Sequence, residues 1–411
     1  MKNKKVLIVS YKLGTDSGVG GRRWLHYGLE LLRRGYNIYF LTYESNIPQE
    51  LLSYKDNVFF IKNNYPKVLK TSPIFFFQKL LYRYWVIKLG LINKGIVYDE
   101  TVRTKKKFLG KALEIINKKE ISHLIVTGAP FSLLHFGSIL KEKFPTIKFI
   151  SDYRDSWTQG IGYGIKQLSY IKFQHELELE KKVLRSSDIV IAASNDIEQA
   201  LKKIEPAVKI VVLPNFVNID QYNNLNVISP IGKPSDTIVI THIGSVNNDT
   251  SRYWIHFLTN VDQLIKKNNL KIFCQFIGGE NKVIREYVSS NKLNFVSFFS
   301  NMSSERLPAF MVDSDYFIFF KNDAFPHSFP TKFFDYVFFR KPLLCYSIKG
   351  EVTNEIENNK IGIIFNEKTS FDEFKKVLTN FYQQNDFNQY YDYTKYSLVN
   401  LTTVLENKLF N

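Results

Sequence analysis

The stretch FPTKFFDYVFFRKP, residues Phe329–Pro342, combines a turn, an apolar helical pattern and a Lys-Pro stop in one short segment. Pro330 suits the first helical position, where its missing N–H costs no hydrogen bond. The helix N-terminus carries a partial positive charge and unpaired N–H groups, so with Lys332 beside it this position suits a phosphate. Asp335, three residues on, can accept from the vicinal hydroxyls of a ribose. The segment therefore indicates a nucleotide-diphosphate site, and an ordinary capped amphipathic helix is the alternative.

The composition is that of a globular chain with more than one core. At 411 residues and 45% hydrophobic content, two domains of roughly 200 residues are expected. Cys274 and Cys345 lie in apolar runs, which predicts buried thiols in a reducing compartment. The start MKNKKVLIVS has too short an apolar run for a signal peptide or anchor, and no run of about 18 uncharged apolar residues predicts a transmembrane helix. The net charge of +16 favours anionic partners, either nucleic acid or acidic lipid.

Short β-branched or aromatic runs alternate with helical patterns, which predicts parallel sheets in α/β domains. A stretch rich in Asn, Pro and Gly, residues 216–234, is interpreted as the interdomain linker. The predicted domains are residues 1–215 and 216–380, followed by helices in 381–411 that return toward the first domain. The expected strands are 4–10, 37–43, 123–129, 146–151, 187–194, 208–215, 237–245, 270–278, 294–299, 314–320, 342–347 and 361–365.

A glycine-rich loop, GTDSGVGG (14–21), separates the first strand from an expected helix over 22–34. Glycines let the backbone approach a ligand closely, and the helix N-terminus favours an anion. The spacing is not GxGxxG, so the loop is interpreted as ligand-facing only because Arg22 and Arg23 follow it. Gly20, Gly21 and Arg22 are therefore candidates for an acceptor-side or phosphate-facing loop. Two exposed arginines on a first turn are the alternative.

The expected strand at 146–151 runs into the sequence DYRDSW (152–157). Ligands of open α/β sheets bind outside the carboxyl ends of the strands, so Arg154 and Asp155 are candidate catalytic residues. A structural ion pair is the alternative.

Other polar patterns are interpreted as structural. Glu176, Glu178 and Glu180 alternate round one expected helix and predict a solvated face. Asp313-Ser314-Asp315 has the spacing of an Asp-x-Asp metal motif, but it ends a helix and opens a strand, so Asp315 is assigned to the strand start and no metal is predicted. His135 and His242 are assigned to the core or to loops.

Residues 62–119 form a basic insertion that contains PIFFFQKLLYRYWVIKLGLI (73–92). Lys79, Arg83 and Lys88 interrupt this apolar run, and no acidic residue occurs from 73 to 98. The pattern predicts an interfacial helix on an anionic membrane, with contact through about 73–111, and the charges exclude spanning. An insertion that packs its apolar residues on the domain is the alternative. No nucleic-acid module is recognisable, so no nucleic-acid partner is expected.

Six motifs occur in order along nearly the whole chain. They are GVGGRR, GAPFSLLHFGSIL, SDYRDSW, the pair EKKVLRSSDIVIAAS and LPNFVNIDQY, HIGS, and FPTKFFDYVFFRKPLL. Together they resemble the GT-B fold glycosyltransferases of the large retaining family 4, in the bacterial branch for capsule, O-antigen and exopolysaccharide.

The resemblance implies two Rossmann-like, doubly wound domains facing a central cleft. It implies transfer of a sugar from a nucleotide-sugar donor held mainly on the second domain, without cofactor or obligatory metal. Lys332 and the backbone of Gly244 and Ser245 would hold the diphosphate, and Asp335 the ribose. The full set of donor-binding candidates is Gly244, Ser245, Arg252, His327, Pro330, Thr331, Lys332 and Asp335.

The chain departs from the family pattern at three positions. Asp335 stands where the family has Glu, so the ribose contact needs a shorter reach. His327 stands where the family has a second acid, and Arg340 replaces the glycine before Lys-Pro.

The sequence thus predicts a hexosyl- or N-acetylhexosaminyl-transferase, cytoplasmic and peripheral on the inner face of the plasma membrane. It would extend a lipid-linked oligosaccharide with retention, and Arg22, Arg154 and Asp155 would face the acceptor. The alternatives are a nucleotide-sugar 2-epimerase of the same fold and a non-catalytic nucleotide-sugar or lipid-binding protein. A binder would take up donor without releasing free nucleotide.

Overall fold

The computed structural model describes the chain in fifteen stretches and single residues. These are residues 4–15, 19–63, 65–69, 73–92, 95–96, 99–219, 222, 233, 236–246, 248–279, 282–302, 306–321, 323, 327–383 and 391–410. The chain divides into two compact units. The first is Met1–Pro214 with Leu401–Asn411, and the second is Asn215–Asn400.

The first unit is built on a seven-stranded parallel sheet. The strand order is β3-β2-β1-β4-β5-β6-β7, so the chain reverses direction across the sheet between β1 and β4. Both faces are covered by helices, which explains why these strands are nearly continuous apolar runs. The strands are β1 (Lys5–Ser10), β2 (Asn37–Thr42), β3 (Val58–Phe60), β4 (His123–Gly128), β5 (Lys148–Tyr153), β6 (Ile189–Ala192) and β7 (Ile210–Val212).

The two faces of this sheet carry different helices. Leu7 and Val9 of β1 share one core with α3 (Lys105–Lys119), α4 (Ser132–Lys143), α5 (Tyr170–Ser186) and α6 (Asn195–Ile204). On the other face lies α1 (Val19–Arg33), where Gly28 leaves room for Phe40 and Ile8. The C-terminal helix α14 (Leu398–Leu409) ends in this unit, and Leu405, Leu409 and Phe410 are buried.

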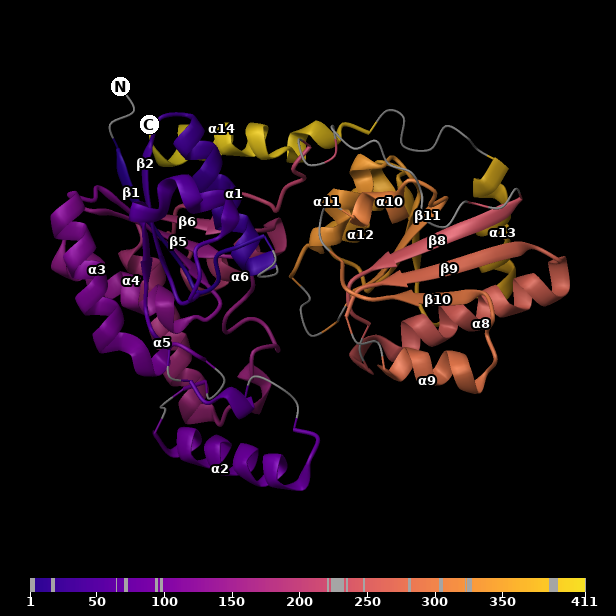
Figure 1. Ribbon diagram of the computed structural model, residues 1–411, viewed down its shortest axis with the longest axis horizontal. Helices are drawn as coiled ribbons and strands as arrows, with labels where there is room; N and C mark the ends of the chain where they lie inside the picture. The colour runs from indigo at the N-terminus through magenta and orange to yellow at the C-terminus, as the bar shows by residue number, and fades with distance from the viewer. Residues whose placement is uncertain are drawn as a thin grey trace. The chain divides into compact units, whose positions relative to one another are not determined.

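Helix α2 (Phe76–Ile92) lies apart from these layers (Figure 1). Leu89 is fully buried, but most of the helix's apolar side chains are exposed. The exposure contradicts, for α2, the interpretation in which the apolar residues of the insertion pack on the domain. In the second half of the predicted insertion, Phe108 and Ala112 of α3 do pack in the core.

The second unit repeats the architecture with a six-stranded parallel sheet, ordered β10-β9-β8-β11-β12-β13. The order reverses between β8 and β11. Its strands are β8 (Thr237–Ile243), β9 (Lys271–Ile277), β10 (Val296–Phe299), β11 (Tyr316–Phe320), β12 (Leu343–Tyr346) and β13 (Gly362–Phe365).

Side chains alternate along β11 between two cores, as the period of two in a strand requires. Ile318 and Phe320 pack with α8 (Ser251–Asn268), α9 (Lys282–Ser290) and α13 (Phe371–Gln383). Phe317 and Phe319 pack with α10 (Leu307–Met311), α11 (Thr331–Phe338) and α12 (Glu351–Asn358). In Figure 1, α8 and α9 lie on one side of this sheet and α11 and α12 on the other.

The doubly wound α/β prediction is confirmed in both units. Strand β3 was not expected, and several strands are shorter than expected, such as β7, which spans Ile210–Val212 and not 208–215. Two other boundaries bear on the candidate sites. Helix α1 begins at Val19, within the glycine-rich loop, and β5 continues through Asp152 and Tyr153. Both cysteines are buried free thiols, as predicted. Among the described residues, no helix is both long and apolar enough to cross a bilayer.

Candidate functional site

In the first unit a cavity of about 270 Å³ lies where the strand order reverses, at the carboxyl ends of β1 and β4. This is where open α/β sheets bind ligands. The cavity is lined by Ser10, Tyr11, Lys12, Gly20, Ile96, Asp99, Glu100, Thr127, Ala129, Pro130, Phe131, Arg154 and Tyr163.

The candidate catalytic pair belongs to this cavity. The Arg154 Nε atom donates to Asp155 Oδ2 at 3.2 Å, and the Tyr163 hydroxyl donates to the same oxygen at 2.6 Å. Burial opposes the charge of Arg154, but Asp155 and Tyr163 hold the pKa of its guanidinium above the ordinary value. Any side chain at Gly20 would overlap this guanidinium. The structure thus brings Gly20, Arg154 and Asp155 together around a permanent cation.

The rest of the predicted loop faces elsewhere. Gly21 is buried, and its carbonyl accepts from the Gly14 amide at 3.5 Å. Arg22 is half-buried, and its charge helps to lower the pKa of His26, mainly depressed by burial. Neither belongs to the described residues that line the cavity.

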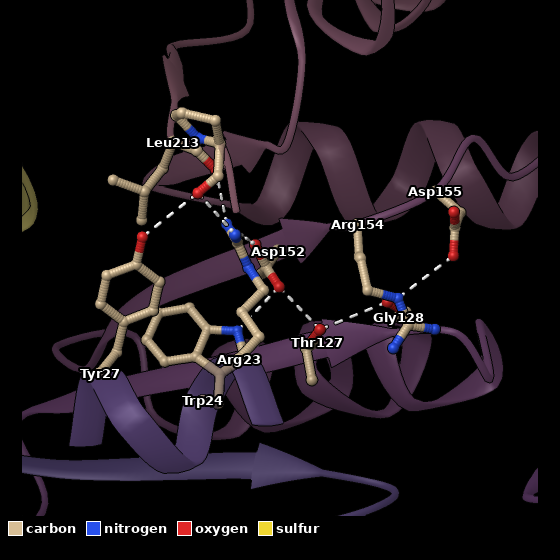
Figure 2. Close-up of polar contacts among 10 residues, drawn as sticks. Arg23, Trp24, Tyr27, Thr127, Gly128, Asp152, Arg154, Asp155 and Leu213 are labelled. Carbon is tan, nitrogen blue, oxygen red and sulfur yellow. Dashed lines mark hydrogen bonds and ion pairs between the residues drawn. The ribbon is translucent and has the colours of Figure 1, made fainter. Parts of the chain in front are cut away.

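Arg23 is buried, with 2% of its surface exposed, so the interpretation of two exposed arginines is wrong for this residue. Figure 2 shows why: its guanidinium reaches the fully buried Asp152, with Arg23 Nη2 lying 3.2 Å from Asp152 Oδ1. Asp152 Oδ2 accepts from Trp24 Nε1 and from Thr127 Oγ1, each at 2.7 Å. A buried carboxylate requires such partners. The pair therefore fixes α1 against β4 and β5.

The same arginine also secures the end of the unit. Arg23 donates to the carbonyl oxygens of Leu213 at 2.7 Å and Pro214 at 2.9 Å. The Tyr27 hydroxyl lies 3.2 Å from the Pro214 oxygen (Figure 2). Pro214 is the last residue of the first unit before the chain enters the second.

Two carboxylates of the cavity were not foreseen from the sequence. Asp99 is buried and accepts from the backbone N–H and the hydroxyl of Ser132, both at 2.7 Å, which anchors the start of α4. Glu100 is half-buried and accepts from the Tyr11 hydroxyl. Both residues lie within the basic insertion of residues 62–119, where no motif distinguishes them from surface acids.

The predicted solvated face on α5 is wrong for Glu176 and Glu180, which are buried. Residues four apart share a helix face, whereas Glu178 between them points away and pairs with Lys181. Glu176 accepts from the Ile96 amide and from Trp157 Nε1, each at 2.8 Å. Because Ile96 lines the cavity, Glu176 holds part of the cavity wall in place.

Glu180 lies deeper on the same face. Its Oε2 accepts from the backbone N–H of Thr158 at 3.1 Å and from the Thr158 hydroxyl. Its Oε1 is buried without a hydrogen-bond partner in the described structure. Burial raises the pKa of Glu180 to about 7.

In the second unit the site lies at the corresponding reversal, between β8 and β11. Gly244 follows β8 with φ of +101°, and a Cβ atom there would lie 3.2 Å from Lys332 Nζ. Gly278, after β9, has no room for a Cβ atom, which would lie 2.8 Å from the Gly244 backbone. At Gly279 a Cβ atom would lie 3.2 Å from Ser245 Oγ. The glycines thus leave bare backbone beside the Lys332 ammonium.

Lys332 on α11 is a half-buried cation. Burial lowers its pKa to about 8, and no acidic group of the described chain counteracts this. The neighbouring His242 is buried with Nδ1 2.9 Å from the Ile318 carbonyl oxygen. Burial first, and then the Lys332 charge, keep the pKa of His242 well below its ordinary value. The interpretation of His242 as a core residue is confirmed.

A second cavity of about 660 Å³ adjoins this position through Gly278 and Gly279. Its remaining lining residues are Lys282, Arg285, Glu286, Ser300 and Asn301. Sequence analysis did not single it out, although a glycine pair after an apolar strand, followed by basic residues in the next helix, is a usable signal.

The other donor-binding candidates have various surroundings. Asp335 on α11 accepts from the Tyr222 hydroxyl at 2.9 Å. Arg252 is ion-paired with Asp323 and, at 3.4 Å, with Glu367. His327 and Thr331 are half-buried.

Pro330 and Asp315 both stand at the start of an element. Helix α11 begins at Thr331, and Pro330 is its N-cap residue. The prediction that Pro330 occupies the first helical position is off by one residue. Asp315 precedes β11 and accepts from Lys233 and, at 2.8 Å, from the Val239 amide, which agrees with its strand-start assignment.

Solved structures resemble the chain over nearly its full length. Sucrose-phosphate synthase from Thermosynechococcus elongatus aligns with a TM-score of 0.66 at 12% identity, covering 100% of this chain and 95% of the other. The lipopolysaccharide outer core galactosyltransferase WaaB aligns with a TM-score of 0.61 at 12% identity, covering 99% of each chain. A UDP-N-acetylglucosamine 2-epimerase aligns with a TM-score of 0.57 at 13% identity, covering 100% of this chain and 96% of the other. No family model and no curated protein matches the sequence.

At these identities the likeness shows the fold. The chain has the GT-B fold of two Rossmann-like units, which glycosyltransferases and epimerases share.

Proposed function

We propose that this protein is a glycosyltransferase that moves a sugar from a nucleotide-diphosphate sugar to a lipid-linked glycan. The observation that carries the proposal is the half-buried Lys332 ammonium, which lies beside the bare backbone of Gly244 at the strand reversal of the second unit. A partly buried cation favours an anionic ligand. A diphosphate supplies the negative charge that the described neighbours of Lys332 do not provide.

The donor would occupy the second unit from α11 to α9. Lys332, the Gly244–Ser245 backbone and the first turn of α11 would bind the diphosphate, and Asp335 would exchange its Tyr222 contact for the ribose. The neighbouring cavity of about 660 Å³ would take the rest of the nucleoside. A fixed cation at the leaving phosphate stabilises the charge that develops as the bond from the sugar to the phosphate breaks.

The acceptor would occupy the cavity of the first unit. Its hydroxyl would form the new bond to the sugar, with retention, and its proton would pass to the departing phosphate. Arg154, a permanent cation held by Asp155, would stabilise charge on the acceptor side, and Glu100 offers a carboxylate to sugar hydroxyls. We place this reaction in bacterial surface-polysaccharide synthesis, on a hexosyl or N-acetylhexosaminyl donor.

The test is thermal unfolding with UDP-, GDP-, CMP- and dTDP-sugars. A ligand at 100 times its dissociation constant stabilises by about 2.7 kcal/mol, so binding raises the melting temperature of wild type. Lys332→Ala and Lys332→Met should abolish the shift, and the matched control Lys376→Ala, on an exposed face of α13, should retain it. Shifts in the Lys332 variants equal to wild type would refute the donor site.

Turnover separates the possible activities. A glycosyltransferase releases nucleotide only when acceptor is added and yields an elongated glycan. An epimerase converts the donor sugar without acceptor. A binding protein gives the thermal shift and no product, and either of the last two results would overturn the proposal.

A further inference from the structure

Apolar side chains gather on α2 and face solvent. Nine large ones between Ile74 and Leu91 are 48–83% exposed. Within the helix, Phe77, Leu80, Tyr84, Ile87 and Leu91 recur at alternating spacings of three and four, which places them on one face. An exposed apolar face of this length marks an interaction site in a folded protein.

The patch extends to a second element that the sequence did not connect with it. Tyr170 and Ile171, at the start of α5, are 77% and 81% exposed. The next residue, Lys172, donates from Nζ to the Gly90 carbonyl near the end of α2, at 2.6 Å. The exposed residues of α2 with Tyr170 and Ile171 are called the docking face below.

Cations flank the docking face. At 100° per residue, Lys79 and Arg83 fall on one side of the apolar stripe and Lys88 on the other, while the buried Leu89 falls opposite. Lys88 lies 4.8 Å from the centre of the Trp85 ring. Basic side chains on both sides of an apolar stripe that includes a Tyr are the arrangement of helices that lie in a membrane interface.

The charges decide the occupant. A second copy of this chain would bring Lys79, Arg83 and Lys88 against their own counterparts, and no acidic residue between 73 and 98 is available to pair with them. An anionic bilayer offers phosphates to the cations and acyl chains to the apolar side chains.

The docking face and the cavity of the first unit are linked through neighbouring residues. The chain that leaves α2 supplies Ile96, Asp99 and Glu100 to the cavity wall. Helix α5, which begins with Tyr170 and Ile171, holds Ile96 through Glu176. The cavity wall is thus built by the chain that follows α2 and is supported by α5, the two helices that carry the docking face.

We propose that the docking face binds the surface of an anionic lipid bilayer, with α2 in the plane of the interface. Its purpose, to present lipid-linked acceptor to the cavity, rests on the proposed function, whereas its affinity for lipid does not.

The experiment is flotation of the full chain with vesicles of phosphatidylcholine, with or without phosphatidylglycerol. Wild type should float with the anionic vesicles and lose binding as salt is raised. F77E/L91E should lower the bound fraction more than about tenfold, and K79Q/R83Q by a comparable factor on anionic vesicles alone. The matched control Leu52→Glu, an exposed apolar residue elsewhere in the first unit, should bind like wild type.

These substitutions lie on exposed positions, so circular dichroism should show unchanged folding. The proposal is overturned if wild type does not float with anionic vesicles. It is also overturned if F77E/L91E floats to the same extent as wild type. A concentration-dependent dimer that F77E/L91E abolishes, with no vesicle binding, would assign the face to a second copy and equally overturn it. Nucleotide-sugar thermal shifts of F77E/L91E should match wild type. A failure of the proposed donor site is thereby distinguished from a failure of membrane binding.

Discussion

At the scale of single residues, several charged side chains are buried or half-buried. Arg23 and Asp152 are compensated within one network, Arg154 by Asp155, and Lys332 by no acid of the described structure. A half-buried cation without an acidic partner costs folding free energy, and such residues concentrate at functional sites. Lys332 is therefore the residue at which ligand charge has most to contribute.

Donor binding should weaken as pH rises through about 8. The ordinary lysine pKa is 10.5, and burial lowers that of Lys332 to about 8, so the protein loses the cation above this pH. A diphosphate binds the charged form and loses affinity once it is neutral. Isothermal titration between pH 6.5 and 9.5 measures this decline, and Lys332→Arg should remove it because arginine stays charged. A wild-type affinity that stays constant over this range would contradict the assignment.

At the scale of elements, helix α5 serves three neighbours from one face. Glu176 holds the cavity wall, Glu180 holds Thr158, and Trp157, bonded to Glu176, stacks on Phe131 with ring centres 5.2 Å apart. Its first turn belongs to the docking face. Because α5 buries two carboxyl groups, the free energy of its packing depends on pH.

Glu180 should make stability fall with rising pH. Its folded pKa of about 7 lies above the ordinary 4.5, so the folded state binds more protons between these values and the stabilisation is lost as pH rises through 7. The shift corresponds to about 3 kcal/mol. Glu180→Gln should flatten the melting temperature between pH 5 and 8, measured against Glu178→Gln on the exposed face. If Glu180→Gln keeps the wild-type dependence of melting temperature on pH, that dependence arises from other titrating groups.

Sequence reasoning located the apolar strands and the helix that follows Pro330 because these depend on local pattern and spacing. It missed the burial of Arg23, Glu176 and Glu180, since whether a polar side chain is buried depends on partners distant in the chain, such as Asp152 and Ile96. The cavity beyond the carboxyl ends of β9 and β10 was missed for the same reason: its residues converge only when the sheet forms. Short β3 carries too few residues for a periodic signal.

At the scale of the whole molecule, each unit has its own sheet and its own cores, and the chain's last residues belong to the first unit. Phe410 packs on Tyr36 and His123, and Arg34 pairs with Glu406. The C-terminal segment is thus structural support for a unit that begins four hundred residues earlier.

Removal of residues 401–411 should destabilise the first unit and leave the second intact. The loss exposes the apolar surface that Leu405, Leu409 and Phe410 cover, worth about 1.5–3 kcal/mol for each large side chain. Calorimetry of the truncated chain should show the first unit melting earlier, while the nucleotide-sugar shift is retained. Loss of that shift together with the stability would mean that the units do not fold independently.

The buried pair of Arg23 and Asp152 restricts how this chain can diverge. Loss of either partner strands the other's charge in the core, at a cost of about 3–5 kcal/mol, whereas joint replacement by apolar residues of similar volume is tolerated far better. A lineage can therefore lose this ion pair only if both residues are substituted together. Descendants of one ancestor should carry both residues or neither, and the two positions, 129 residues apart, should be inherited as one character.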